Sequence, residues 1–159
     1  MNYQNWSDYK QGWVFRHREL PVPEETLADI RPLAEADANQ FWRQHISKEA
    51  SHASHFMNDD WPARNGVWTD QGDWQGPWDA DSNELPELMA AHLSWDDNTQ
   101  VFFCYSVDHI VHTSWKILRL HWKNFLFYDD EPILIARKRQ QTVRFHSDGT
   151  FDIGIRPAG

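Results

Sequence analysis

Four tryptophans stand within eighteen residues of a polar, turn-rich stretch, and this cluster limits how that stretch can fold. The four are Trp61, Trp68, Trp74 and Trp78. A tryptophan carries a large apolar ring and one N–H group that needs a hydrogen-bond partner when it is buried. The residues between the four are rich in Asp, Gly, Asn and Pro. The tryptophans therefore either fix an irregular segment onto the core or present an aromatic surface for binding.

The negative charge of the chain is concentrated in the same region. The formal net charge is −9. Residues 58–97 hold ten acidic residues and one basic residue, Arg64, a balance of −9, whereas residues 1–57 carry −2 and residues 98–159 carry +2. An acidic surface repels phosphate backbones and attracts basic proteins. We therefore expect no nucleic-acid binding by this region. A basic protein partner is one interpretation of the charge, and simple solubility is the other.

The remaining composition is typical of a globular protein. With 159 residues the chain is long enough to bury a core, and we expect a single domain over residues 1–159. No apolar run reaches the roughly eighteen residues of a membrane span. The first ten residues lack the features of a signal peptide, so we expect a cytoplasmic protein. The single cysteine, Cys104, lies in an apolar run and is expected to be buried.

Helical patterns dominate the first two-thirds of the chain. Pro23-Glu24-Glu25 places proline in a first turn and acidic residues at the positive end of a helix dipole. Apolar residues at helical spacing predict a second helix over about residues 33–46. Asn83 is predicted to cap a third helix that ends near Leu93. Between these helices the periodicity fails, and we expect only short helical turns. Residues 13–15 predict a short strand.

The last third carries strand patterns. Residues 99–105 are apolar on both faces, which is typical of a central strand. Thr113 or Ser114 is predicted to cap a helix whose apolar stripe continues to Phe125. Further strands are predicted over residues 110–111, 125–128, 133–137 and 141–147 and from residue 151, with turns at 129–132 and at Asp148-Gly149. The predicted fold class is α+β, with a helical N-terminal two-thirds that contains a Trp-rich irregular segment, packed on a mainly antiparallel C-terminal sheet.

Short catalytic motifs are absent from the sequence. We find no nucleophile elbow, phosphate loop, dinucleotide fingerprint or Cys-x-x-Cys motif. We therefore assign no catalytic residue and no cofactor, and favour a non-enzymatic protein. Adjacent carboxylates occur at Asp59-Asp60, Asp96-Asp97 and Asp129-Asp130-Glu131. Adjacent residues rarely converge on one substrate, and turn chemistry alone explains all three.

Two histidine pairs have the spacing of metal ligands. His52 and His55 lie in a weakly helical stretch, where a separation of three residues puts both imidazoles on one face. Asp59-Asp60 would complete such a metal site, and solvated histidines are the simpler alternative. His109 and His112 flank a predicted strand, where the same spacing directs the side chains to opposite faces, so we expect no shared metal ion there.

A basic cluster follows the strand predicted at residues 133–137. It consists of Arg137, Lys138, Arg139 and Arg144. Strand alternation would place Arg137 and Arg139 on one face and Lys138 on the other. A phosphate or RNA site is one interpretation, because aromatic residues are close by in the sequence. Protection of an edge strand by like charges is the alternative that we favour.

A set of motifs extends through the second half of the chain. They are Leu93-Ser94-Trp95-Asp96-Asp97-Asn98-Thr99, Phe103-Cys104-Tyr105, Trp122-Lys123-Asn124-Phe125-Leu126-Phe127, Arg137-Lys138-Arg139, Phe145-His146 and Gly149-Thr150-Phe151. The chain resembles, over nearly its whole length, the small bacterial family known as domain of unknown function 2947. That family carries no assigned activity, so the resemblance implies no catalytic residue. The stretch from Thr113 to Phe127 more loosely resembles small immunity proteins of bacterial toxin systems.

Three functional hypotheses follow. The first is a non-enzymatic protein that engages a basic protein partner through an acidic, Trp-rich surface, as the looser resemblance to immunity proteins implies. Its candidate binding residues are Trp61, Trp68, Trp74, Trp78, Asp59, Asp60 and Asp73. The second is a small-ligand binder or enzyme with a tryptophan platform near His52, His55, Asp59 or Asp60. The third is RNA contact through the basic cluster. The sequence does not decide whether the oligomeric state is a monomer or a homodimer.

Overall fold

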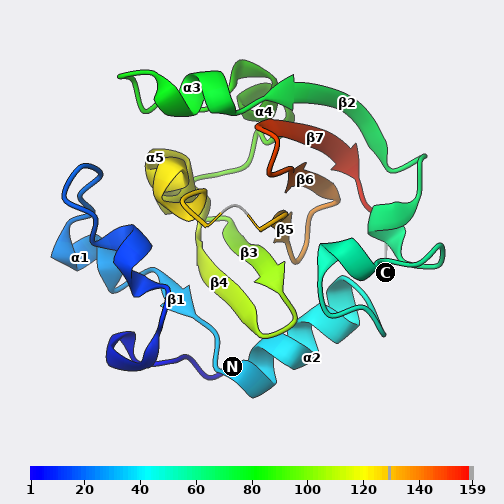
Figure 1. The fold of residues 1–159 in the computed structure, drawn as a ribbon, viewed down its shortest axis with the longest axis horizontal. Helices are drawn as coiled ribbons and strands as arrows, with labels where there is room; N and C mark the ends of the chain where they lie inside the picture. Colours follow the sequence, from blue (N-terminus) through cyan, green and yellow to red (C-terminus); the bar gives the residue numbers. More distant parts are fainter. Residues whose placement is uncertain (129, 158–159) are drawn as a thin grey trace.

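A seven-stranded antiparallel sheet forms the centre of the computed structural model, which describes residues 1–128 and 130–157 (Figure 1). The strand order is β1-β4-β3-β5-β6-β7-β2. The strands are β1 (Arg31–Pro32), β2 (Trp68–Asp73), β3 (Gln100–Ser106), β4 (His109–Ser114), β5 (Ile133–Ala136), β6 (Gln141–Phe145) and β7 (Thr150–Ile155). Every neighbouring pair in this order is antiparallel. The first half of the chain supplies both edge strands, β1 and β2.

Helices cover the two faces of this curved sheet. In the described residues they are α1 (Glu24–Leu27), α2 (Glu35–His45), α3 (Gln75–Asp79), α4 (Glu87–His92) and α5 (Trp115–Phe125). Helix α2 lies on one face, and α3, α4 and α5 lie on the other (Figure 1). Short 3-10 helices span Trp6–Asp8, Gly12–Phe15, Ala53–His55 and Trp61–Ala63. None of the helices in the described ranges combines the length and apolar character that crossing a membrane requires.

The prediction of a helical N-terminal two-thirds packed on a C-terminal sheet is wrong. Helices α1 and α4 have only four and six residues, and residues 1–98 supply two strands, β1 and β2. The Trp-rich segment is not irregular throughout, because it contains β2 and α3. The sequence of β2 is polar and lacks apolar alternation, so its extended form depends on hydrogen bonds to β7 rather than on its own residues.

Several local predictions are also corrected. Residues 13–15 lie in a 3-10 helix instead of a strand, and residues 126–128 follow the end of α5 without forming a strand. The N-cap of α4 is Pro86 rather than Asn83. The turn predicted at residues 129–132 begins at Asp129, which lies outside the described residues.

Other local predictions are confirmed. Helix α2 matches the predicted helix within two residues at each end. Ser114 caps α5, since its side chain accepts a hydrogen bond from the N–H of Ile117 at 3.3 Å. The β6–β7 hairpin turns at Asp148-Gly149, and Gly149 has a φ of 94°, a conformation that favours glycine.

Strand β3 separates two apolar cores. Its residues Val101, Phe103 and Tyr105 belong to the larger core, which includes α5. Its residues Phe102 and Cys104 belong to the smaller core beneath α2. The prediction of a central strand that is apolar on both faces is therefore confirmed. The smaller core is where the sheet meets the pocket described below.

Candidate functional site

All four clustered tryptophans donate their indole N–H to a main-chain carbonyl. Trp61 donates to His45 at 2.8 Å, Trp68 to Pro62 at 2.8 Å, Trp74 to His146 at 3.0 Å and Trp78 to Lys123 at 3.0 Å. Trp74 is buried and the other three are half-buried. Trp74 and Trp78 pack on the larger core, whereas Trp61 packs on the smaller one. Trp61, Trp74 and Trp78 therefore anchor the Trp-rich segment to other parts of the fold. The bond from Trp68 to Pro62 joins two residues within the segment.

The acidic residues of this segment point mostly to solvent. Nine of the ten acidic residues in residues 58–97 are exposed, and Asp60 is the exception. Asp60 accepts a hydrogen bond from the N–H of Met57 at 2.9 Å. Asp73 accepts from the N–H of Gln75 at 3.0 Å, at the start of α3. The carboxylates of Asp60 and Asp73 thus stabilise local backbone, whereas that of Asp59 accepts no hydrogen bond within the described residues.

One hollow brings some of the predicted binding residues together. Asp59, Asp60 and Trp61 line a hollow of about 340 Å³, which Arg43, Lys48 and Arg64 also line. Trp68, Trp74, Trp78 and Asp73 are outside its lining. Of the seven predicted binding residues, three therefore line this hollow and four lie elsewhere in the segment.

Both ring nitrogens of His52 contact other residues of the protein. Its Nδ1 lies 2.9 Å from the hydroxyl of Ser54, and its Nε2 lies 3.0 Å from a carboxylate oxygen of Asp130. His55 is exposed. Within residues 1–128 and 130–157, no three His, Cys, Asp or Glu residues gather closely enough to hold a metal ion. The predicted ligands Asp59 and Asp60 are therefore not assembled around these histidines.

The other histidine pair is divided between the two faces of the sheet, as predicted. His109 Nε2 lies 2.7 Å from the hydroxyl of Tyr9, on the side of the larger core. His112 Nδ1 lies 2.8 Å from the hydroxyl of Tyr3, and its ring stacks on Phe102 in the smaller core. The two imidazoles cannot share a ligand.

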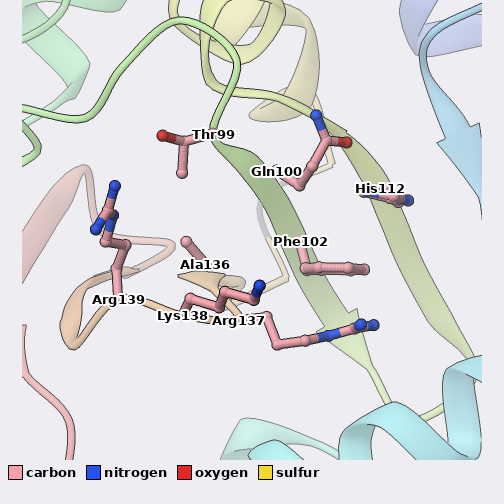
Figure 2. Close-up of a pocket in the computed structure, with 8 residues that line it drawn as sticks. All are labelled: Thr99, Gln100, Phe102, His112, Ala136, Arg137, Lys138 and Arg139. Atoms are coloured by element: carbon pink, nitrogen blue, oxygen red, sulfur yellow. The ribbon is translucent and has the colours of Figure 1, made fainter.

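A pocket of about 380 Å³ opens where β3 and β4 meet the turn after β5 (Figure 2). Its lining comprises Thr99, Gln100, Phe102, His112, Ala136, Arg137, Lys138 and Arg139. Figure 2 shows Arg137 and Lys138 reaching toward the Phe102 side and Arg139 reaching toward Thr99. The three cationic side chains of one turn therefore surround a single hollow.

Stacked rings form the floor of this pocket. The ring of Phe102 lies 4.4 Å from that of His112 with an angle of 10° between them, and 4.2 Å from that of Phe41. The guanidinium carbon of Arg137 lies 5.4 Å from the centre of the Phe102 ring. A cation over an aromatic face is attracted by the ring, so this contact holds the Arg137 side chain at the pocket.

A buried arginine shapes the turn that carries the three cations. The guanidinium of Arg156 donates to the carbonyl oxygens of Ala136 at 2.7 Å, Arg137 at 2.9 Å and Arg139 at 3.1 Å. Strand β5 ends at Ala136, so the predicted strand alternation, with Lys138 on the opposite face, is wrong. A turn, unlike a strand, lets three consecutive side chains face one pocket.

Arg144, the fourth member of the basic cluster, is engaged elsewhere. Its Nε lies 2.6 Å from a carboxylate oxygen of Asp152, and its Nη1 donates to the carbonyl of Pro62 at 2.8 Å. Its guanidinium also lies over the ring of Trp68. Arg144 therefore belongs to the anchoring of the Trp-rich segment and not to the pocket.

The pocket carries uncompensated positive charge. In the part of the chain that the structure describes, no carboxylate lies within 4.0 Å of Arg137, Lys138 or Arg139. Burial lowers the pKa of His112 to about 4, and the nearby cations Arg31 and Arg137 act in the same direction. His112 is therefore neutral near pH 7. Three cations without counter-charges can bind an oxyanion through charge-assisted hydrogen bonds.

The basic residues of the pocket are evident in the sequence, but the groups that support them are not. Phe102, His112 and Arg156 come from three different strands or their ends. Arg156 directly follows the alternating residues of β7. A single basic residue at the end of this strand is the only sign of its role that the local sequence gives. Nothing in the sequence places it beneath the turn at Arg137.

Comparison with known proteins identifies the family. A family model described as "Protein of unknown function (DUF2947)" matches residues 3–154. No match was found among curated proteins or solved structures. The match covers nearly the whole chain, which confirms the resemblance given by its sequence motifs. The chain therefore belongs to the DUF2947 family, whose function is unknown.

Proposed function

We propose that this chain is a binding protein whose site is the pocket at Arg137, Lys138 and Arg139, and whose ligand is a small anionic molecule. The observation that carries the proposal is the gathering of three cations around one hollow, with no carboxylate of residues 1–128 and 130–157 within 4.0 Å of them. Its volume, about 380 Å³, lies within the range of roughly 300–1,000 Å³ that is usual for ligand pockets.

The chemistry of the lining favours an oxyanion. Arginine presents a planar fork of donors that matches a carboxylate or phosphate, and lysine adds a mobile positive charge. The hydrogen bonds from Arg156 hold the turn in place before a ligand arrives, which lowers the ordering cost of binding. The net charge of −9 repels long polyanions, so a small anion that enters the pocket suits this protein better.

Thermal unfolding with citrate or inorganic phosphate at low salt tests the proposal. The test variant replaces Arg137, Lys138 and Arg139 by Gln. The control replaces the exposed residues Lys10, Arg18 and Lys116 by Gln, which changes the net charge equally. A ligand at tenfold its Kd stabilises the folded protein by about 1.4 kcal/mol.

The pocket variant and the control variant should differ in how their Tm responds to the anion. We expect a rise in Tm with anion in the native chain and in the control, and none in the pocket variant. An equal rise in all three proteins would reject the pocket as the binding site. No rise in the native chain with either anion would reject the function.

A second candidate function is the engagement of a basic protein through the acidic segment at residues 58–97. The observation in its favour is the exposure of nine acidic residues on a segment that three indole hydrogen bonds anchor to the rest of the fold. The exposed acidic residues, more than the buried and half-buried tryptophans, would meet the partner. Such charge mainly accelerates association and makes it sensitive to salt.

Affinity capture from the source cell with washes of rising salt tests this second function. One variant carries Asp79→Asn, Asp81→Asn and Glu84→Gln, and a control carries Glu19→Gln, Glu24→Gln and Glu25→Gln. A basic partner should be recovered at low salt with the native chain and the control and lost with the segment variant. Failure to recover any basic protein at low salt would count against the function.

A further inference from the structure

A second hollow adjoins the basic pocket and shares Arg137 with it. It has a volume of about 570 Å³ and lies between the Arg137 side chain and one face of α2. Its lining comprises Met1, Asp37, Gln40, Phe41, Gln44, His45 and Arg137. The five residues from α2 follow the spacing i, i+3, i+4, i+7 and i+8, so they form one stripe along the helix. Figure 2 shows Arg137 extending past Phe102, with α2 drawn in pale cyan below it.

The two hollows have a continuous aromatic floor. Phe41 of α2 stacks on Phe102 at 4.2 Å, and His45 packs on Phe41 at 4.5 Å. Burial lowers the pKa of His45, and the cations Arg156 and Arg137 lower it further. His45 is therefore a neutral ring at pH 7, with the capacity both to donate and to accept one hydrogen bond.

The polar side chains of this stripe are available to a ligand, because Gln40 and Gln44 are exposed and Asp37 is half-buried. In residues 1–128 and 130–157, the side chains of Asp37, Gln40 and Gln44 make no hydrogen bond or ion pair. The two amides each offer donors and an acceptor, and the carboxylate offers acceptors only. A partner rich in hydroxyl groups suits this mixture, because each hydroxyl both donates and accepts.

We propose that the ligand of this site is a sugar or polyol with a single anionic group. This inference rests on the function proposed for the basic pocket and extends it to the adjoining hollow. The anionic group binds among Arg137, Lys138 and Arg139, and the hydroxyl groups extend past Arg137 along the polar stripe of α2. Asp37 disfavours a second negative charge at the far end through like-charge repulsion.

Other ligand classes fit the second hollow less well. An apolar tail would cover Gln40 and Gln44 without satisfying their amides, which is unfavourable. A nucleic-acid strand repeats its phosphates and would bring one toward Asp37. A lone phosphate or carboxylate would leave the second hollow unused.

Titration calorimetry with five probes tests the inference. They are glucose 6-phosphate, glycerol 3-phosphate, glucuronate, glucose and inorganic phosphate, which separate the anionic group from the hydroxyl-bearing body and distinguish phosphate from carboxylate. The test variant is Gln40→Leu with Gln44→Leu, and the control is Gln11→Leu, since Gln11 lines neither hollow. Urea unfolding checks that each variant is folded.

We expect at least one anionic sugar or polyol to bind about tenfold or more tightly than inorganic phosphate. The double variant should reduce its affinity to that of inorganic phosphate, and the control should not. A second variant, Asp37→Asn, is titrated with one additional probe that carries two phosphates, fructose 1,6-bisphosphate, and its affinity for this probe relative to glucose 6-phosphate should rise.

The failures of the two proposals are distinguishable. If every anion binds with equal affinity and the α2 variants change nothing, the sugar or polyol inference is overturned while the basic pocket keeps its function. If no probe binds the native chain, both are overturned.

Discussion

The buried guanidinium of Arg156 donates a hydrogen bond from Nη2 to the main-chain carbonyl of Arg137 at 2.9 Å, so one arginine holds the backbone from which another reaches the pocket. Arg156 also donates to the carbonyls of Ala136 and Arg139. Its charge is thus satisfied by backbone oxygens and not by a carboxylate within the described residues. The site depends on this buried group as well as on its exposed cations.

Replacement of Arg156 by Met should destabilise the protein by about 2–4 kcal/mol. The substitution keeps an unbranched side chain but leaves buried carbonyl oxygens without their donor, and hydrogen bonds from charged groups contribute about 1.5–3 kcal/mol each. Urea unfolding measures the change. Arg139→Met is the matched control, because Arg139 is exposed, and its effect should stay within about 0.5 kcal/mol. Equal effects of the two substitutions would contradict the role of Arg156.

Replacement of Trp74 by Phe should destabilise the protein by about 1–3 kcal/mol. The change removes the indole N–H that donates to His146 at 3.0 Å and leaves unfilled volume in the core. Trp13→Phe is the control, since Trp13 is 54% exposed and should tolerate the change within about 0.5 kcal/mol. Denaturant unfolding of both variants measures the difference. An unchanged midpoint for Trp74→Phe would show that the anchor at this position is dispensable.

Stability should fall as the pH is lowered from about 6.5 to about 4. Burial lowers the pKa of His109 to about 4, while the carboxylates of Asp108 and Asp130 act in the opposite direction. An unfolded histidine has a pKa near 6.5, so within this interval the unfolded chain binds a proton that the folded chain excludes. His109 alone accounts for a loss of about 3 kcal/mol at the acid end. His112 adds to it with the same sign, because burial lowers its pKa to about 4 as well.

Urea unfolding at several pH values between 7 and 4 measures this loss. His109→Gln should reduce the pH dependence, because the substituted residue does not titrate. The exposed His55→Gln is the matched control. If His109→Gln kept the full slope of the native chain, another group would be responsible for it.

Replacement of Gly72 by Ala should cost about 1–3 kcal/mol. A Cβ atom at Gly72 would lie 2.5 Å from Cζ of Phe151, within the larger core, so β2 or the ring would have to move. Gly66→Ala is the control, since a Cβ there meets no atom within 4 Å. Thermal unfolding compares the two variants. The same Tm for both would mean that β2 does not approach Phe151 this closely.

The elements that the sequence predicted correctly are those whose apolar residues recur at a regular spacing. Helix α2 has a full apolar stripe and β3 is apolar on both faces, so each is visible in its own residues. Strands β1 and β2 are short or polar, and they are extended because β4 and β7 offer free hydrogen-bonding edges. The prediction of a helical N-terminal two-thirds failed at these two strands.

The basic residues of the candidate site could also be predicted from the sequence, whereas their arrangement around the pocket could not. The run Arg137-Lys138-Arg139 is conspicuous in the sequence, but its placement around one hollow required β5 to end at Ala136 and Arg156 to lie beneath the turn. The contact between Arg137 and Phe102 joins residues far apart along the chain. Long-range contacts of this kind leave no periodic signal in either segment.

The sequence by itself determined the family, the acidic balance of residues 58–97, the helix at α2 and the central strand β3. These follow from local composition and periodicity, which each segment carries independently of the others. The tertiary structure decided how the clustered tryptophans are used, because an indole N–H finds its carbonyl only after the chain has folded. It also gathered the cations around the pocket, because that arrangement depends on hydrogen bonds between residues distant in the chain.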